Sequence, residues 1–119
     1  MTKVVLIADD DEDILALLAF RLEREGYEVL AARDGEEALA LARGRRPAVA
    51  VLDVAMPGLD GLAVARAIRA DGLATRVVLL TARAREEDVR RGIAAGADGY
   101  ITKPFSPAHL DWRLAELLQ

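Results

Sequence analysis

Three short runs of branched apolar residues constrain the fold of this chain more than any other feature. They occupy residues 4–8, 48–52 and 77–80, and none of them alternates apolar with polar side chains. A strand that is apolar at consecutive positions buries both faces, as the central strands of a parallel sheet do. Residues 27–31 and 100–102 have the composition of two further strands, the second of them short and partly polar like an edge strand. The sequence therefore predicts five strands.

Between these runs, apolar residues recur at the spacing of amphipathic helices. Asp34 with Glu37 has the pattern of a capping box, Asp60 is placed to cap the third helix, and Ser106 precedes a proline at a first helical position. Glycines stand where four of the helices are expected to stop, at Gly26, Gly44, Gly72 and Gly96. The helical stretches themselves are marked by Ile14, Leu15, Leu18 and Leu22; Ala38, Leu39 and Leu41; Leu62, Ala65 and Ile68; Val89, Gly92 and Ile93; and Leu110, Leu114 and Leu117.

Strand and helix thus alternate five times in 119 residues, without a linker, a repeat or a low-complexity tract. This pattern predicts one α/β domain over residues 1–119, a doubly wound (βα)5 unit with a parallel sheet. The expected strand order is the flavodoxin-like 2-1-3-4-5.

Composition excludes several classes of function. The chain has no cysteine and one histidine, so neither a zinc site nor cysteine chemistry is available. Its net charge of −4 argues against direct binding of nucleic acid by this domain. The longest apolar run, residues 14–20, is too short for a membrane span or a secretory signal, and we expect a cytoplasmic location with no membrane partner.

The residues that end the apolar runs are polar and of types that carry chemistry. In an open parallel sheet, ligands bind beyond the carboxyl ends of the strands. In the predicted strand order, four neighbouring strands bring three carboxylates, a hydroxyl and an ammonium to the same edge; they are Asp9, Asp10, Asp53, Thr81 and Lys103. We expect these five side chains to converge on one pocket.

Ordinary structural roles compete with this interpretation. Residues 11–13 are acids in the first turn of a helix, where they interact favourably with its dipole, and we assign them no chemistry. Asp53 would be a helix cap if a helix followed directly, but a Met-Pro-Gly turn delays the next helix until after Asp60. Thr81 and Lys103, taken singly, are compatible with surface positions. Their joint placement favours a site.

Three clustered carboxylates repel one another unless a divalent cation neutralises them. With only oxygen ligands present, Mg²⁺ is the expected ion and Mn²⁺ is possible. Such a site also holds phosphate oxygens, with Lys103 as a point charge and Thr81 as a hydroxyl donor. One carboxylate then remains as a nucleophile, and Asp53 is the best candidate because Asp9 and Asp10, as consecutive residues, are better placed to share the metal.

Four sequence blocks resemble the receiver domain of two-component response regulators, the CheY-like superfamily. They are VLIADD ending at Asp10, VLDVAMPGLDG at 51–61, LLTA at 79–82 and GADGYITKPF at 96–105. They occur in the family's order and at its spacing, and the resemblance extends from about residue 3 to the last helix.

The resemblance implies that Asp53 accepts a phosphoryl group from a sensor histidine kinase, a phosphotransfer protein or a small phosphodonor. It implies that Asp10 and Asp53 bind Mg²⁺ directly, that Asp9 holds a metal-bound water, and that the backbone carbonyl of Ala55 completes the protein ligands.

The resemblance assigns further positions around the acceptor. Thr81 and Lys103 would contact the phosphoryl oxygens, and Ala82 is the small residue that leaves the acceptor open. Tyr100 stands at the aromatic switch position, and the Lys103–Pro104 bond is where the family carries a cis peptide. Phosphorylation would then reshape the surface of the fourth helix, fifth strand and fifth helix, which controls an output domain or partner protein.

The dimer that DNA-binding members form through this surface depends on a regular set of salt bridges. Here Val89, Gly99 and His109 stand where those members usually have a basic, an acidic and an acidic residue. The sequence is therefore compatible with a monomer or with a phosphorylation-dependent homodimer. Trp112, expected to be exposed on the last helix, is a candidate for a different partner surface.

Three other functions compete with the receiver interpretation. A haloacid-dehalogenase-like phosphatase also uses an Asp nucleophile with Mg²⁺, but it needs a second Asp two residues later, where this chain has Ala55. A nucleotide-binding module would need a Gly-rich loop after the first strand, which is absent from the sequence. An adaptor that keeps only the fold is disfavoured because every expected site residue is present.

Overall fold

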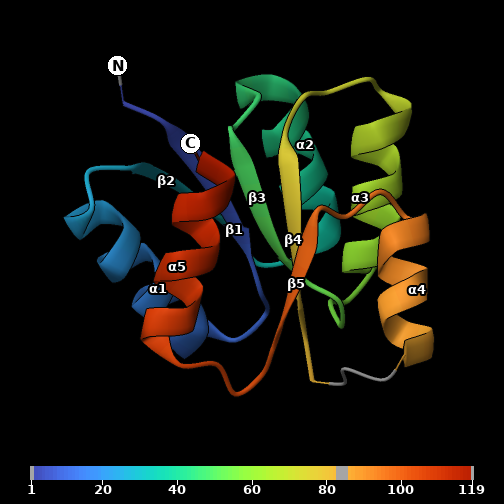
Figure 1. The fold of residues 1–119 in the computed structure, drawn as a ribbon. Coiled ribbons are helices and arrows are strands. Elements are labelled where there is room, and N and C mark those ends of the chain that lie inside the picture. Colours follow the sequence, from blue (N-terminus) through green and yellow to red (C-terminus); the bar gives the residue numbers. More distant parts are fainter. Residues whose placement is uncertain (1, 83–85, 119) are drawn as a thin grey trace.

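The computed structural model describes residues 2–82 and 86–118, except the side chain of Glu86 (Figure 1). Strands and helices alternate along the chain without exception in these ranges. The elements are β1 Val4–Ala8, α1 Glu12–Arg24, β2 Glu28–Ala32, α2 Gly35–Arg45, β3 Val49–Asp53, α3 Gly61–Ala70, β4 Arg76–Thr81, α4 Glu86–Ala94, β5 Gly99–Thr102 and α5 Pro107–Leu118. None of the helices described has the length and apolar character needed to cross a bilayer.

The five strands form one parallel sheet in the order β2-β1-β3-β4-β5, so the predicted doubly wound α/β fold is confirmed. Helices α1 and α5 cover one face, and α2, α3 and α4 lie on the other (Figure 1). Strands β2, β3 and β4 each end one residue later than the sequence predicts, so Asp53 and Thr81 are themselves the last residues of β3 and β4.

Two apolar layers hold the sheet between the helices. One contains Leu15, Leu18 and Leu22 of α1 with Leu110 and Leu114 of α5, all at most 4% exposed. The other joins α2 and α3 to the opposite face through Ala38, Leu39, Ala42, Leu62, Val64, Ala65 and Ile68. Because the central strands are covered on both sides, their side chains are buried at every position of β3. This explains the consecutive apolar runs in the sequence.

Most of the predicted helix ends are confirmed. The Asp34 and Asp60 carboxylates accept from backbone N–H groups in the first turns of α2 and α3, and the Ser106 hydroxyl accepts from the N–H of His109. The left-handed glycines after α1, α3 and α4 are at positions 26, 72 and 96.

One predicted helix end is wrong. Gly44 lies inside α2, and the left-handed position at the end of that helix is taken by Arg46, with a φ of 46°. Its backbone N–H still donates to Ala42 O, so the capping hydrogen bond is made. The left-handed backbone that allows this bond is strained in an arginine, whereas a glycine would adopt it freely.

Candidate functional site

The carboxyl ends of four neighbouring strands bring the five predicted side chains together. Asp9 and Asp10 follow β1, Asp53 ends β3, Thr81 ends β4, and Lys103 follows β5. Three carboxylate oxygens, one each from Asp9, Asp10 and Asp53, lie within 4.8 Å of one another. Asp10, Asp53, Thr81 and Lys103 line one pocket, whereas Asp9 joins the cluster through its carboxylate but does not line that pocket.

The three carboxylates differ in their surroundings. Asp9 is fully buried; one of its oxygens accepts from the backbone N–H of Asp11 at 2.9 Å and the other from the Lys103 ammonium at 2.8 Å. Asp53 is 5% exposed. Asp10 is exposed, and among the described residues no group donates a hydrogen bond to its carboxylate. Asp10 is thus the carboxylate of the cluster most open to an incoming ligand.

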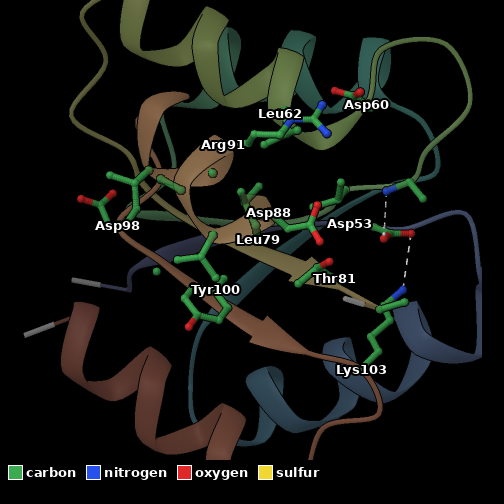
Figure 2. Close-up of a pocket in the computed structure, with 18 of the residues that line it drawn as sticks. Asp53, Asp60, Leu62, Leu79, Thr81, Asp88, Arg91, Asp98, Tyr100 and Lys103 are labelled. Atoms are coloured by element: carbon green, nitrogen blue, oxygen red, sulfur yellow. Dashed lines mark hydrogen bonds and ion pairs between the residues drawn. The ribbon is translucent and has the colours of Figure 1, made fainter. Parts of the chain in front are cut away.

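Lys103, which follows β5, forms ion pairs with two carboxylates of the acidic cluster. Its Nζ lies 2.8 Å from Asp9 Oδ2 and 3.4 Å from Asp53 Oδ2. Figure 2 shows the Asp53 carboxylate between this ammonium and the backbone N–H of Ala55, which donates to Oδ1 at 3.2 Å. The peptide bond between Lys103 and Pro104 is cis, as the family resemblance led us to expect.

Burial makes the Asp53 carboxylate a weaker acid than an ordinary aspartate. Burial in the site raises the pKa of Asp53 to about 6, and the negative charge of Asp9 adds to the rise; Lys103 and the Ala55 N–H oppose it. Burial alone would lower the pKa of Lys103, but its hydrogen bond to Asp9 and the charges of Asp53 and Asp9 outweigh that effect and raise it. The site is thus short of positive charge, which a divalent cation would supply.

The raised pKa of Asp53 predicts a pH-dependent stability in metal-free protein. Asp53 binds its proton more tightly in the folded than in the unfolded chain, so its ionisation lowers the free energy of unfolding as pH rises from about 4 through about 6. Asp53→Asn removes this effect. We expect the stability of the variant relative to wild type to increase by about 1–3 kcal/mol between pH 4 and pH 7, measured by urea unfolding in EDTA.

Asp71→Asn is the control for this prediction. Its hydrogen bond from Arg43 lowers the pKa of Asp71, so the ionised form favours folding. The relative stability of this variant should move in the opposite direction with pH. Parallel profiles for the two variants would contradict the assigned electrostatics.

A cavity of about 700 Å³ extends from the acidic cluster beneath α4. Asp53, Thr81 and Lys103 line one end, and Tyr100 and Asp98 line the other. In Figure 2 the Thr81 hydroxyl points toward the Asp53 side of this cavity, whereas the Tyr100 hydroxyl points away from it. Tyr100 is 38% exposed. The two predicted switch residues therefore line one continuous space.

Two small residues that line the cavity with Asp53 are exposed, namely Ala55 and Ala82. Neither carries a side chain long enough to cover Asp53. A glycine that sequence reasoning missed also shapes the site: a Cβ on Gly61 would lie 2.5 Å from the backbone oxygen of Asp53, so α3 starts directly against the end of β3. Its position directly after the cap residue Asp60 was the one available signal.

The comparisons with known proteins decide the family. A sequence profile of the response regulator receiver domain matches residues 5–115. The chain belongs to this family. It is 44% identical over 119 residues to the alkaline phosphatase synthesis transcriptional regulatory protein PhoP of Bacillus subtilis, covering 100% of this chain and 50% of that protein. It is 46% identical over 115 residues to the transcriptional regulatory protein PrrA of Mycobacterium tuberculosis, covering 97% and 49%.

Solved structures agree with this assignment. The chemotaxis response regulator CheY4 of Vibrio cholerae superposes with a TM-score of 0.93 at 36% identity, covering 99% of this chain and 100% of that one. The BeF3-activated DrrB receiver domain gives a TM-score of 0.90 at 35% identity, covering 99% and 98%. This chain is therefore a receiver domain of two-component signalling, and it spans about half the length of the curated relatives it matches.

The surface formed by α4, β5 and α5 carries exposed aromatic groups beside charged ones in this receiver domain. Trp112 is 60% exposed, as expected, and its ring centroid lies 6.2 Å from that of His109. A Cβ on Gly99 would meet the Arg113 guanidinium at 2.7 Å, so this guanidinium lies over β5, and it pairs with Glu116 at 3.4 Å.

Proposed function

We propose that this receiver domain is the phosphoacceptor of a two-component pathway and that Asp53 accepts the phosphoryl group. The observation that supports this most directly is the Asp53 carboxylate itself. It opens into the cavity, bounded by an ammonium and a backbone N–H, with two further carboxylates close by. The structure describes no other buried carboxylate that lines this cavity.

The transfer is a displacement at phosphorus. An oxygen of Asp53 forms the new O–P bond, and the bond from phosphorus to the donor breaks, which in a phosphohistidine is the N–P bond. The departing imidazole nitrogen takes up a proton. Asp53 must be ionised to attack, and at pH 7 the carboxylate with a pKa of about 6 is largely so.

The donor set fits Mg²⁺, with Mn²⁺ possible, because it consists of oxygens from three carboxylates and lacks sulfur or imidazole. Asp10 and Asp53 would bind the ion directly, Asp9 through a water, and Ala55 through its backbone carbonyl. Bound there, the ion would neutralise the cluster and the incoming phosphoryl oxygens. The burial of Asp9 and its two hydrogen bonds support the indirect role.

The remaining residues are assigned by their place in the cavity. Thr81 and Lys103 contact the phosphoryl oxygens, and Lys103 changes partner from the carboxylates to the phosphoryl group. The small side chain of Ala82 keeps the acceptor open. Tyr100 rotates inward when Thr81 is drawn to the phosphoryl group, and this changes the surface of α4, β5 and α5. The cis bond before Pro104 sets the direction in which the chain leaves the site.

The domain spans residues 1–119 and works in the cytoplasm, without direct contact with nucleic acid or membrane. Its phosphoryl donor is a sensor histidine kinase or a phosphotransfer protein. The surface of α4, β5 and α5 controls an output domain or a partner protein, and the domain is a monomer or a phosphorylation-dependent homodimer. It assists its own phosphorylation and dephosphorylation, but it turns over no separate substrate.

Two alternatives remain distinguishable by experiment. A phosphatase of the haloacid-dehalogenase type would hydrolyse added phosphoesters catalytically, and Ala55 removes the second acid which that chemistry uses. An adaptor that is never phosphorylated would leave Asp53 unmodified.

Incubation with acetyl phosphate, followed by intact-mass spectrometry, tests the proposal. We expect one phosphoryl group per chain with Mg²⁺ and little in EDTA. A protein that stays unmodified with Mg²⁺ present, or one that turns over many equivalents of an aryl phosphate, would contradict the phosphoacceptor function.

Magnesium affinity should separate the roles of the two consecutive acids. Asp10→Ala removes an exposed direct ligand, so we expect Mg²⁺ to bind on the order of a hundredfold more weakly, by calorimetric titration. Asp9→Ala should cost less, about tenfold, because Asp9 acts through a water. Asp13→Ala removes a nearby exposed charge and controls for net charge. Equal losses in Asp9→Ala and Asp10→Ala would contradict this division.

A further inference from the structure

Arg69 of α3 binds the segment that connects α4 to β5, and each of its guanidinium nitrogens donates a hydrogen bond. Its Nε donates to the Gly96 carbonyl at 2.9 Å, its Nη1 to the Leu73 carbonyl at 3.1 Å, and its Nη2 to Asp98 Oδ2 at 2.7 Å. All three guanidinium nitrogens therefore have acceptors, and two of those acceptors lie beyond the end of α4. A planar guanidinium that is bonded in three directions fixes its partners in orientation as well as in distance.

Asp98 extends this attachment to the sheet. The same oxygen that receives the Arg69 guanidinium accepts from the backbone N–H of Val77 at 2.8 Å, and the other oxygen lies 3.5 Å from Arg76. The backbone N–H of Asp98 also donates to Val77 O at 2.8 Å. The start of β5 is thus held to the edge of β4 by side-chain and backbone bonds together.

Gly96 allows Arg69 to come this close. Its φ is 94°, and a Cβ there would lie 2.3 Å from Arg69 Cγ. The aliphatic part of Arg69 therefore packs directly against the glycine backbone. The neighbouring Ala95 is 2% exposed and belongs to the core on this face of the sheet. The C-terminal end of α4 is consequently held by packing as well as by hydrogen bonds.

The body of α4 is held much less firmly. Of residues 87–94 of this helix only Gly92 is buried, so none of their side chains is, and Asp88, Val89 and Ile93 line the cavity. Ile93 is 64% exposed. A helix that is held at one end and lies over a cavity along the rest of its length moves most easily by pivoting about the held end.

We propose that Arg69 is a positioning residue of the signalling switch, holding the C-terminal end of α4 and the start of β5 fixed so that phosphorylation displaces α4 at its other end. The Tyr100 side chain then rotates while the backbone at the start of β5 stays in place. Only the displacement of α4 rests on the proposed phosphorylation of Asp53, because the attachment by Arg69 exists in the unmodified protein.

The attachment itself is tested without phosphorylation. Arg69→Met keeps the aliphatic stem and removes the three donors, whereas Arg43→Met removes an exposed Arg–Asp pair between α2 and the end of α3. By hydrogen–deuterium exchange, we expect residues 95–99 to exchange about tenfold faster in Arg69→Met and at the wild-type rate in Arg43→Met. Equal rates in wild type and Arg69→Met would overturn the proposal.

The pivot is tested with Mg²⁺ and beryllofluoride, while acetyl phosphate and mass spectrometry report separately on Asp53. In wild type, amide shifts should be large at residues 87–91 and small at 95–98; in Arg69→Met they should spread through 95–98, with Asp53 still phosphorylated. A wild type that shifts most at 95–98, or an unchanged distribution in Arg69→Met, would overturn the pivot. Unmodified Asp53 in wild type would count against the proposed function and leave the exchange test standing.

Discussion

Asp53→Asn should abolish phosphorylation by acetyl phosphate while the fold persists. The amide that replaces the carboxylate has no charged oxygen to attack phosphorus, so the loss should be complete rather than partial. Folding should survive because the variant removes one negative charge from a site that raises the pKa of this very group. Intact-mass spectrometry after treatment with the donor and Mg²⁺ measures the outcome, with circular dichroism as the check on folding.

Asp60→Asn is the matched control for this variant. Asp60 lines the same cavity, but its carboxylate caps α3 by accepting from the N–H of Ala63 at 2.8 Å, a bond that an asparagine oxygen can also accept. This variant should be phosphorylated as wild type is. A phosphoryl group on the Asp53→Asn protein, or its loss from Asp60→Asn alone, would move the acceptor to another carboxylate.

The sheet and the cluster of site residues were predictable because both follow from local patterns. Consecutive apolar residues identify strands buried on both faces, and five alternations of strand and helix favour one doubly wound sheet. Once the strand order is fixed, residues at strand ends become neighbours although they are far apart in the chain. Asp9 and Lys103, 94 positions apart, are the clearest example, and their side chains lie 2.8 Å apart.

Other features depend on contacts that leave no local signal. Gly44 was expected to end α2 because glycine favours the left-handed conformation, yet the helix continues to Arg45 and the left-handed conformation falls on Arg46. The attachment of Arg69 to Asp98 joins segments 29 residues apart, and an arginine on a helix usually indicates no more than a solvated surface. Only the fold reveals that two of its three donors bond the α4–β5 connection.

Thr81→Ala should separate phosphorylation from the response to it. Asp53 is the group that we propose forms the new bond, so the variant should still be modified by acetyl phosphate. Thr81 ends β4 and lines the same cavity as Tyr100, whose hydroxyl points away from Asp53 (Figure 2). In the proposed switch, a phosphoryl group without the Thr81 hydroxyl loses the contact by which its binding would favour the state with Tyr100 turned inward.

The size of this effect is set by the difference in binding between the two states. A phosphoryl group can shift the equilibrium only by its preference for the active state, which for such couplings is about 1–3 kcal/mol. We therefore expect beryllofluoride with Mg²⁺ to shift the amides of Tyr100 and Val89 strongly in wild type and weakly in Thr81→Ala.

Thr102→Ala provides the control for the Thr81 variant, since Thr102 pairs with Thr81 in the register of β4 and β5 but belongs to the strand that receives the signal. It should respond as wild type does. Equal shifts in wild type and Thr81→Ala would show that the signal reaches β5 by another route. Lys103 would then be the leading alternative, because it contacts Asp53 and directly follows β5 in the chain.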